Sequence, residues 1–153
     1  PRTGKGWKNF GKRLEALSRY YRAEGFAFAW HNHDFEFVPL NDGSTPHELV
    51  FSAAPTLDWE IDVAWVIRAG SNPLKWIRAY AGAITFAHVK DIAPSGRCVD
   101  EEGWADVGHG TVKWKTLINA LRQTRCMHYV MEHDKPSDAE RFARRSIAAA
   151  RKY

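Results

Sequence analysis

The chain has 153 residues, of which 44% are hydrophobic and 26% charged, a balance that predicts one globular domain with a buried core. Seven Trp, five Tyr and eight Phe argue against disorder, and no stretch approaches the ~20 apolar residues that a membrane-spanning helix requires. The net charge of +4 is spread along predicted helix faces, with only a modest basic cluster near the C-terminus, so a nucleic-acid interface is not expected.

The N-terminal part of the chain is predicted to form a helix followed by a buried strand. Apolar residues recur at intervals of four, three and four within residues 7–24, which places them on one helical face. Gly25 is expected to end this helix. The apolar run at residues 26–30 then predicts a strand, which leads directly into the sequence HNHDFEF at residues 31–37.

The rest of the chain repeats the alternation of strand and helix. Apolar runs predict three more strands, at residues 57–63, 83–89 and 127–131. Helices are predicted between and after the strands, at residues 46–54, 72–82 and 112–123, and from a capping box at residues 137–140 onward. The glycine-rich loop at residues 92–110 is long enough to indicate a functional segment.

This order of elements predicts an α/β fold with parallel strands joined by right-handed crossovers. Ionisable residues follow all four predicted strands, and parallel strands bring such residues to one edge. A doubly wound sheet would gather them at one crevice, whereas a (β/α) TIM-type barrel would bring all four to one axial site. We prefer the barrel, with residues 1–153 as a single domain.

Each predicted strand ends near a side chain that can bind a metal ion. The candidate ligands are His31, with Glu36 as the alternative from the same strand, Asp62, His88 and Glu132. Imidazole and carboxylate together suit a divalent ion, Mn²⁺ first, with Zn²⁺, Co²⁺ or Mg²⁺ as alternatives. Each of these residues alone would more often be a buried histidine, a helix cap or an ion-pair partner, but their recurrence at equivalent positions favours a metal site.

Five stretches of the chain, taken in order, resemble the sugar phosphate isomerase/epimerase family. This family consists of xylose-isomerase-like barrels and includes inosose dehydratases and ketose epimerases. The similar stretches are residues 31–37, 61–70, 88–91, 107–110 and 130–134. No single stretch is unique to the family, but the ordered set is specific.

The resemblance implies that the four strands are the fifth to eighth of an eight-stranded barrel, and so the C-terminal four β/α units. It also implies that one residue from each strand holds a divalent ion. Asp62, His88 and Glu132 carry over directly, whereas His31 stands where epimerases of the family commonly have Glu. His109 replaces the acidic residue of the more usual Gly-Glu-Gly sequence, which is expected to alter the contacts of its loop.

The family chemistry is proton transfer next to a carbonyl group. The resemblance therefore implies a divalent-metal-dependent isomerase or epimerase that acts on a keto sugar or sugar phosphate through an enediolate. Glu132 is the expected base, with Glu36 or His33 on the opposite face of the substrate.

Two further side chains are expected near the sugar. Lys90 is expected either to bind a substrate oxygen or phosphate, or to form a salt bridge with Asp91 or Asp62. Trp65 follows Asp62 by three residues and is expected to wall the sugar pocket.

Three other functions stay open on the sequence alone. Loss of a β-hydroxyl would give an inosose-type dehydratase on the same scaffold. DNA-repair endonucleases share the barrel, but they use several zinc ions and more ligands than we can assign here. The third alternative is a truncated half-barrel without activity. The sugar, its phosphorylation and the choice between epimerisation and isomerisation are also left open.

A complete barrel needs ~250 residues, so the chain is expected to hold only half of one. We favour a fragment over two alternatives, which are a homo-oligomer of paired halves and a first half supplied by a separate chain. The first residues show no signal-peptide core. Cys98 and Cys126 lie in different predicted elements, so no disulfide framework is expected, and we expect a cytoplasmic location.

Overall fold

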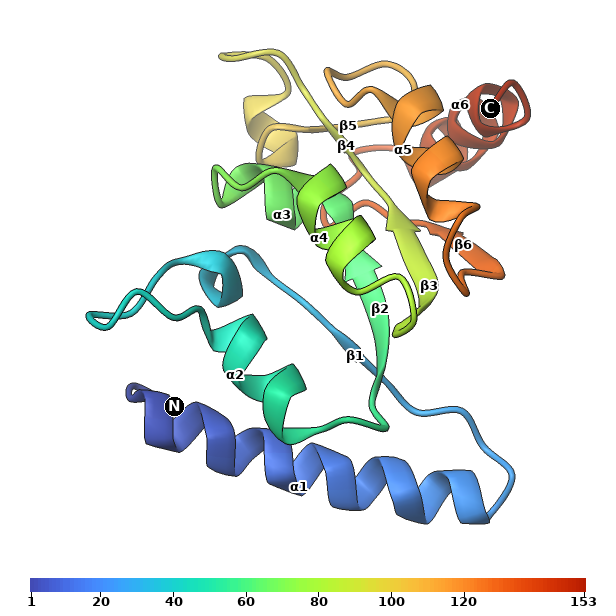
Figure 1. Ribbon diagram of the computed structural model, residues 1–153. Coiled ribbons are helices and arrows are strands. Elements are labelled where there is room, and N and C mark those ends of the chain that lie inside the picture. The colour runs from blue at the N-terminus through green and yellow to red at the C-terminus, as the bar shows by residue number, and fades with distance from the viewer.

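A computed structural model describes residues 1–153 (Figure 1). The helices are α1 (Gly4–Ala23), α2 (Pro46–Ala53), α3 (Val63–Arg68), α4 (Pro73–Ala79), α5 (Trp114–Leu121) and α6 (Ala139–Ala150). The strands are β1 (Ala29–His31), β2 (Asp58–Asp62), β3 (Ile84–Val89), β4 (Asp91–Ile92), β5 (Trp104–Ala105) and β6 (His128–Met131). Two short 3-10 helices are η1 (Asp34–Phe37) and η2 (Val99–Glu101).

The main sheet contains four parallel strands in the order β1-β2-β3-β6 (Figure 1). The order in space follows the order in the chain, as in a barrel, whereas a doubly wound sheet reverses direction at a switch point. The prediction of parallel β/α units that form half of a barrel is confirmed. No helix is long and apolar enough to cross a membrane.

The hydrophobic core lies between this sheet and the helices that cover one of its faces. Alternate residues of a strand point to opposite faces, so Trp59 and Ile61 of β2 enter the core while Glu60 and Asp62 face the other way. Fully or almost fully buried helix residues complete the core from α2, α4 and α5, namely Val50, Ile77, Trp114, Leu117 and Leu121. The face of the sheet that these helices do not cover therefore carries the charged side chains of β2, Glu60 and Asp62.

Helix α1 packs closely on α2 because Gly11 has no side chain. A Cβ atom at Gly11 would lie 2.5 Å from the carbonyl oxygen of Val50. The N-terminus of α1 is capped by Thr3, whose hydroxyl accepts a hydrogen bond from the Gly6 amide. The predicted helix at residues 7–24 is therefore present, and it begins three residues earlier because of this cap.

Two elements near the first two strands differ from the prediction. β1 begins at Ala29 rather than at residue 26, because the preceding segment leaves the sheet and exposes 65% of Phe26. α3 was not predicted, because β2 passes directly into this helix without a turn. Asp62 is the last residue of β2 and also the N-cap of α3, where its Oδ1 accepts a hydrogen bond from the Trp65 amide at 3.0 Å.

The predicted capping box at residues 137–140 is wrong. Asp138 is the N-cap of α6 and accepts a hydrogen bond from the Arg141 amide. Ser137 instead donates both its amide and its hydroxyl to the buried carboxylate of Glu101. Hydrogen bonds from Ser137, together with the neighbouring Arg141, lower the pKa of Glu101 to about 2. Ser137 is thus bonded to the buried Glu101, and Asp138 provides the cap of the helix.

The two ends of the long loop at residues 92–110 are joined by the carboxylate of Asp91. The fully buried Asp91 accepts hydrogen bonds from the amides of Ile92, Gly108 and Val112, at 2.9 to 3.0 Å. The loop also contains a short antiparallel pair, β4 with β5. A Cβ atom at Gly110 would lie 2.2 Å from Asp91 Oδ1 and 2.4 Å from the carbonyl oxygen of Ile92.

Substitution of Gly110 by Ala is therefore expected to destabilise the protein by about 2–3 kcal/mol, because the new methyl group would overlap a carboxylate held by three amides. Urea denaturation followed by circular dichroism measures this loss. Gly82→Ala is the control, since a Cβ atom at Gly82 meets nothing within 4 Å. Equal stability of the two variants would show that the loop adjusts freely around Asp91.

Candidate metal centre

Three of the predicted ligands converge at the carboxyl ends of adjacent strands. His31 ends β1, Asp62 ends β2 and His88 lies near the end of β3, and each offers a ligand atom within 4.8 Å of the other two. The sheet register explains the approach, since Asp62 is the Cα partner of His88. The rings of His31 and His88 are stacked with centroids 4.4 Å apart, and His88 Nδ1 lies 3.6 Å from Asp62 Oδ2.

The atoms that face one another in this group have no hydrogen-bond partner. His31 Nδ1, His88 Nδ1 and Asp62 Oδ2 are all buried and unpaired. Buried polar atoms are almost always paired, and leaving one unpaired costs about 1–3 kcal/mol. Two imidazole nitrogens and a carboxylate oxygen form a donor set that suits a divalent transition-metal ion. The residues present therefore fit such an ion.

The histidines of the group have pKa values shifted in opposite directions. Burial lowers the pKa of His31, and the nearby His88 lowers it further, which favours the neutral imidazole that a metal ion requires. Burial also lowers the pKa of His88, but attraction from Asp62 and from Glu60 more than offsets this effect and leaves the pKa raised.

Glu132, the fourth predicted ligand, lies beside the three unpaired atoms. It directly follows β6, and its Oε2 is 3.8 Å from His88 Nδ1 and 2.8 Å from Lys90 Nζ. Burial raises the pKa of Glu132, while Lys90 opposes this effect. The Glu132 side chain is about one third exposed, so a small molecule in solution can reach its carboxylate.

Lys90 is only 1% exposed and forms salt bridges with Glu132 and Asp134. Its ammonium group also lies 4.1 Å from the centroid of Trp104 and 5.1 Å from that of Trp65.

Of the two salt bridges expected for Lys90, the one with Asp62 is present, with a long nitrogen–oxygen distance of 4.0 Å. The other expected partner, Asp91, binds loop amides instead. Its main partner Asp134 was not predicted, although Asp134 follows Glu132 by two residues, the spacing that places side chains on one side of an extended chain.

His33 and Glu36 occupy different surroundings. The His33 ring lies 4.9 Å from His31 and 5.4 Å from Trp65, measured between ring centroids, and so borders the group. Glu36 is fully buried in η1, where it accepts hydrogen bonds from Trp30 Nε1 at 2.7 Å and from the His33 amide at 3.1 Å. Burial raises the pKa of Glu36 to about 7. Both of its oxygens are engaged by these donors, and His31 rather than Glu36 joins the group of unpaired ligand atoms. The metal-binding or catalytic roles of both residues stay predictions.

Asn32 is a fully buried residue that the sequence did not single out. Its Nδ2 donates to the carbonyl oxygen of Asp62, and its Oδ1 accepts from the Asp62 amide and from Trp59 Nε1, at 2.9 to 3.1 Å. One side chain between His31 and His33 thus ties the end of β1 to the backbone of the ligand on β2. The only available signal was its position between the two histidines.

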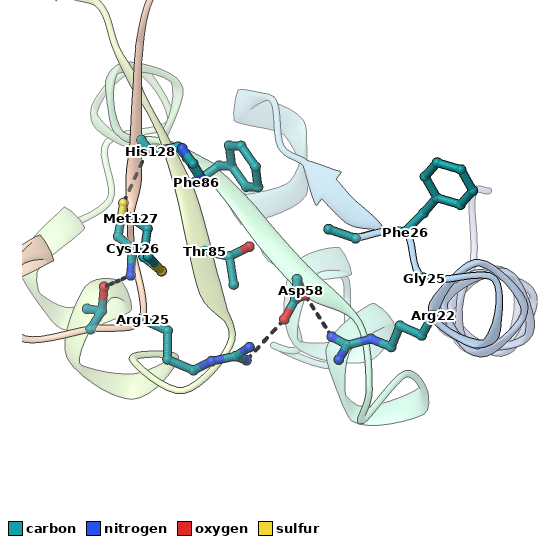
Figure 2. A pocket seen from close by; sticks show the side chains of 12 residues that line it. Arg22, Gly25, Phe26, Asp58, Thr85, Phe86, Arg125, Cys126, Met127 and His128 are labelled. Atoms are coloured by element: carbon teal, nitrogen blue, oxygen red, sulfur yellow. Dashed lines mark hydrogen bonds and ion pairs between the residues drawn. The ribbon is translucent and has the colours of Figure 1, made fainter.

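A broad hollow lies at the opposite end of the sheet, lined by residues at the starts of β2, β3 and β6 (Figure 2). It has a volume of about 820 Å³ and is open to solvent. Figure 2 shows Asp58 between Arg22 and Arg125, with nitrogen–oxygen distances of 2.7 and 3.1 Å. In barrels the chemistry takes place at the carboxyl ends of the strands, so we do not assign this hollow to a substrate.

Comparisons with known proteins show the fold. No protein-family model and no curated protein sequence matches the chain. A solved sugar phosphate isomerase/epimerase from Parabacteroides distasonis matches with a TM-score of 0.76 at 17% identity, over 98% of this chain and 52% of that chain. The probable 3-DHS dehydratase AsbF from Bacillus anthracis, involved in petrobactin synthesis, matches with a TM-score of 0.72 at 13% identity, over 94% of this chain and 56% of that chain.

A xylose isomerase domain protein from Alicyclobacillus acidocaldarius matches with a TM-score of 0.66 at 14% identity, over 97% of this chain and 57% of that chain. The chain thus spans about half the length of the solved structures that it matches. Identities this low establish the architecture alone. The chain has the fold of half a xylose-isomerase-like barrel, the class of fold that its sequence motifs predicted.

Proposed function

We propose that this half-barrel is the metal-binding part of an isomerase or epimerase that acts on a keto sugar or sugar phosphate. The observation that carries the proposal is the group of three unpaired ligand atoms, which comes from the carboxyl ends of three neighbouring parallel strands. Evidence of a second kind is the fold shared with a solved sugar phosphate isomerase/epimerase. Mn²⁺ is our first choice of ion, since the donor set mixes imidazole and carboxylate.

The four proposed ligands are His31, Asp62, His88 and Glu132. A divalent ion held there would supply Lewis acidity to a sugar carbonyl group. The protein's own contribution would be to place Glu132 as the proton acceptor, since burial raises its pKa and about one third of it is exposed. Lys90 would hold the ionised carboxylate in position through its 2.8 Å contact.

The surroundings of the group suit a sugar. Trp65 offers an aromatic face next to His33, 5.4 Å away between centroids, and the apolar face of a sugar ring can pack on such a surface. His33 would then stand on the opposite side of the substrate from Glu132 and donate a proton of its own, while Glu132 retains the proton that it accepted. Donation to the same carbon on the other face gives epimerisation, and donation to the neighbouring carbon gives isomerisation.

A dehydratase is the second candidate function. Loss of a β-hydroxyl after removal of the same proton would need no change in the ligand set. The specific observation in its favour is the TM-score of 0.72 with a probable 3-DHS dehydratase. A multi-zinc endonuclease is less well supported, because only one group of three or more close ligands is present.

The test combines metal content with proton exchange. We expect about one Mn²⁺ per folded chain by elemental analysis, and exchange of the proton next to the carbonyl of a keto sugar in D₂O by NMR. A panel of phosphorylated and unphosphorylated sugars would identify the substrate. A folded protein that binds no divalent ion would contradict the proposal.

Replacement of Glu132 by Gln is expected to reduce this exchange by about 10³-fold or more, because the amide cannot accept the proton. Glu140→Gln is the matched control, since Glu140 is 81% exposed and pairs only with Arg144 on α6. If the Glu132 variant exchanged as fast as the control, Glu132 would not be the base.

A further inference from the structure

We propose that Glu60 is a positioning residue that orients the His88 ring for metal binding. The inference rests on the proposed metal centre, and it deepens that proposal by assigning a role to a residue outside the ligand group. Glu60 lies on β2, on the same face as Asp62 and two residues before it.

The two ring nitrogens of His88 have different surroundings. Nε2 lies 3.0 Å from Glu60 Oε1, which is hydrogen-bonding distance. Nδ1 lies on the other side of the ring, 3.6 Å from Asp62 Oδ2 and 3.8 Å from Glu132 Oε2, and has no hydrogen-bond partner. An ionised carboxylate has no proton to donate and can act only as a hydrogen-bond acceptor. In a neutral His88 ring, Glu60 therefore favours the tautomer in which Nε2 carries the proton. The lone pair of Nδ1 is then directed at the ligand group.

The sheet places Glu60 in this position through an irregularity. The pairing of β2 with β3 shifts register between Trp59 and Glu60, so that one residue of β3, Thr85, has no partner. After the shift, Glu60 is the partner of Phe86 and Asp62 is the partner of His88. Bulges of this kind re-aim side chains next to functional sites. Here two of the three carboxylates of β2, those of Glu60 and Asp62, approach the same imidazole, one at each nitrogen.

Glu60 itself is not placed as a ligand. The three atoms that lie within 4.8 Å of one another belong to His31, Asp62 and His88. The remaining neighbour of the His88 ring is His31, which stacks on its face and contributes no hydrogen bond to Nε2. Glu60 is therefore the residue that we assign as the hydrogen-bond partner of His88 Nε2, the ring nitrogen that points away from the ligand group. Partners of this kind on metal-binding histidines typically change metal affinity by about 10–100-fold when they are removed.

The experiment compares Glu60→Leu with the wild-type chain by two measurements. Zn²⁺ affinity is measured by isothermal titration calorimetry, and the His88 tautomer in the metal-free protein is read from the ¹⁵N chemical shifts of its ring. We expect the Leu variant to bind Zn²⁺ about 10–100-fold more weakly and to lose the tautomer with the proton on Nε2. Glu60→Gln keeps an acceptor oxygen and is expected to restore most of the affinity. Glu140→Leu, remote from the centre, is the control.

Each outcome is decisive. Wild-type affinity and an unchanged tautomer in Glu60→Leu would overturn the positioning role. Glu60→Ala adds no bulk and makes the same comparison if the Leu variant does not fold. If even the wild-type chain binds no Zn²⁺, the proposed metal centre fails, and the tautomer measurement in metal-free protein still decides whether Glu60 orients His88.

Discussion

Substitution of Asp62 by Asn is expected to abolish tight metal binding while leaving the metal-free fold as stable as that of the wild type. The two oxygens of this carboxylate have separate tasks. Oδ1 caps α3 by accepting a hydrogen bond from the Trp65 amide, and Asn caps helices as well as Asp does. Oδ2 is buried, unpaired and directed at His88. The substitution therefore removes a ligand oxygen and a negative charge without removing the cap.

We expect a loss of roughly 100-fold or more in affinity for Mn²⁺ or Zn²⁺, because charge attraction is strong in a buried site. Calorimetric titration gives the affinity, and the rise in melting temperature on addition of metal gives an independent measure. Asp138→Asn is the matched control, since Asp138 likewise caps a helix, α6, and is not among the proposed ligands. Equal affinity of the two variants would remove Asp62 from the ligand set.

His47→Leu is expected to make the protein more resistant to acid. His47 is fully buried, and neither ring nitrogen has a hydrogen-bond partner. Five aromatic rings surround it with centroids 4.1 to 5.2 Å away, namely those of Phe37, Phe51, Trp59, Trp76 and Tyr80. Burial lowers the pKa of His47 to about 3. The folded protein therefore holds this imidazole neutral over a range in which the unfolded chain protonates it.

The direction of the effect follows from proton binding. Above pH ~6.5 both states hold His47 neutral, and it contributes no pH dependence. Between about pH 6.5 and pH 3 the unfolded state binds one more proton, so the wild type loses up to roughly 1.4 kcal/mol per pH unit at this position. Leu has no proton to bind and a similar volume, so the variant keeps this stability.

Urea denaturation of wild type and His47→Leu at several pH values between 7 and 4.5 measures the effect. The stability difference should be small at neutral pH and should increase in favour of the variant as the pH falls. His109→Leu, at an exposed histidine, is the control. A pH-independent difference at His47 would mean that its imidazole is protonated equally in both states.

The architecture could be predicted because each β/α unit carries a local signal. Apolar runs and helical periodicity gave four parallel strands and the helices between them, and ionisable residues after each strand indicated which end holds the site. α3 was missed because no turn residue separates it from β2, and because Asp62 serves both elements. The antiparallel pair of β4 and β5 was missed because strands of two residues have no periodicity to detect.

The grouping of the candidate ligands could be predicted where it depends on position along a strand, and not where it depends on contacts between strands. The approach of His31, Asp62 and His88 to one another follows from their positions at strand ends. The role inferred for Glu60 depends on a register shift between β2 and β3, which no local pattern encodes. The orientation of Glu36 depends on Trp30, whose indole N–H donates a hydrogen bond to one of its oxygens.

The order of the strands also determines when the centre can form during folding. Its three unpaired atoms belong to β1, β2 and β3, whose ligand residues are separated by some thirty positions each along the chain. Pairing at such separations requires closure of long loops, so it is among the slower events in folding. No single β/α unit holds more than one of the three atoms. A metal ion therefore has no complete site to bind until the strands of the sheet have paired. It would stabilise the native register after the strands have paired, and it would not guide their pairing.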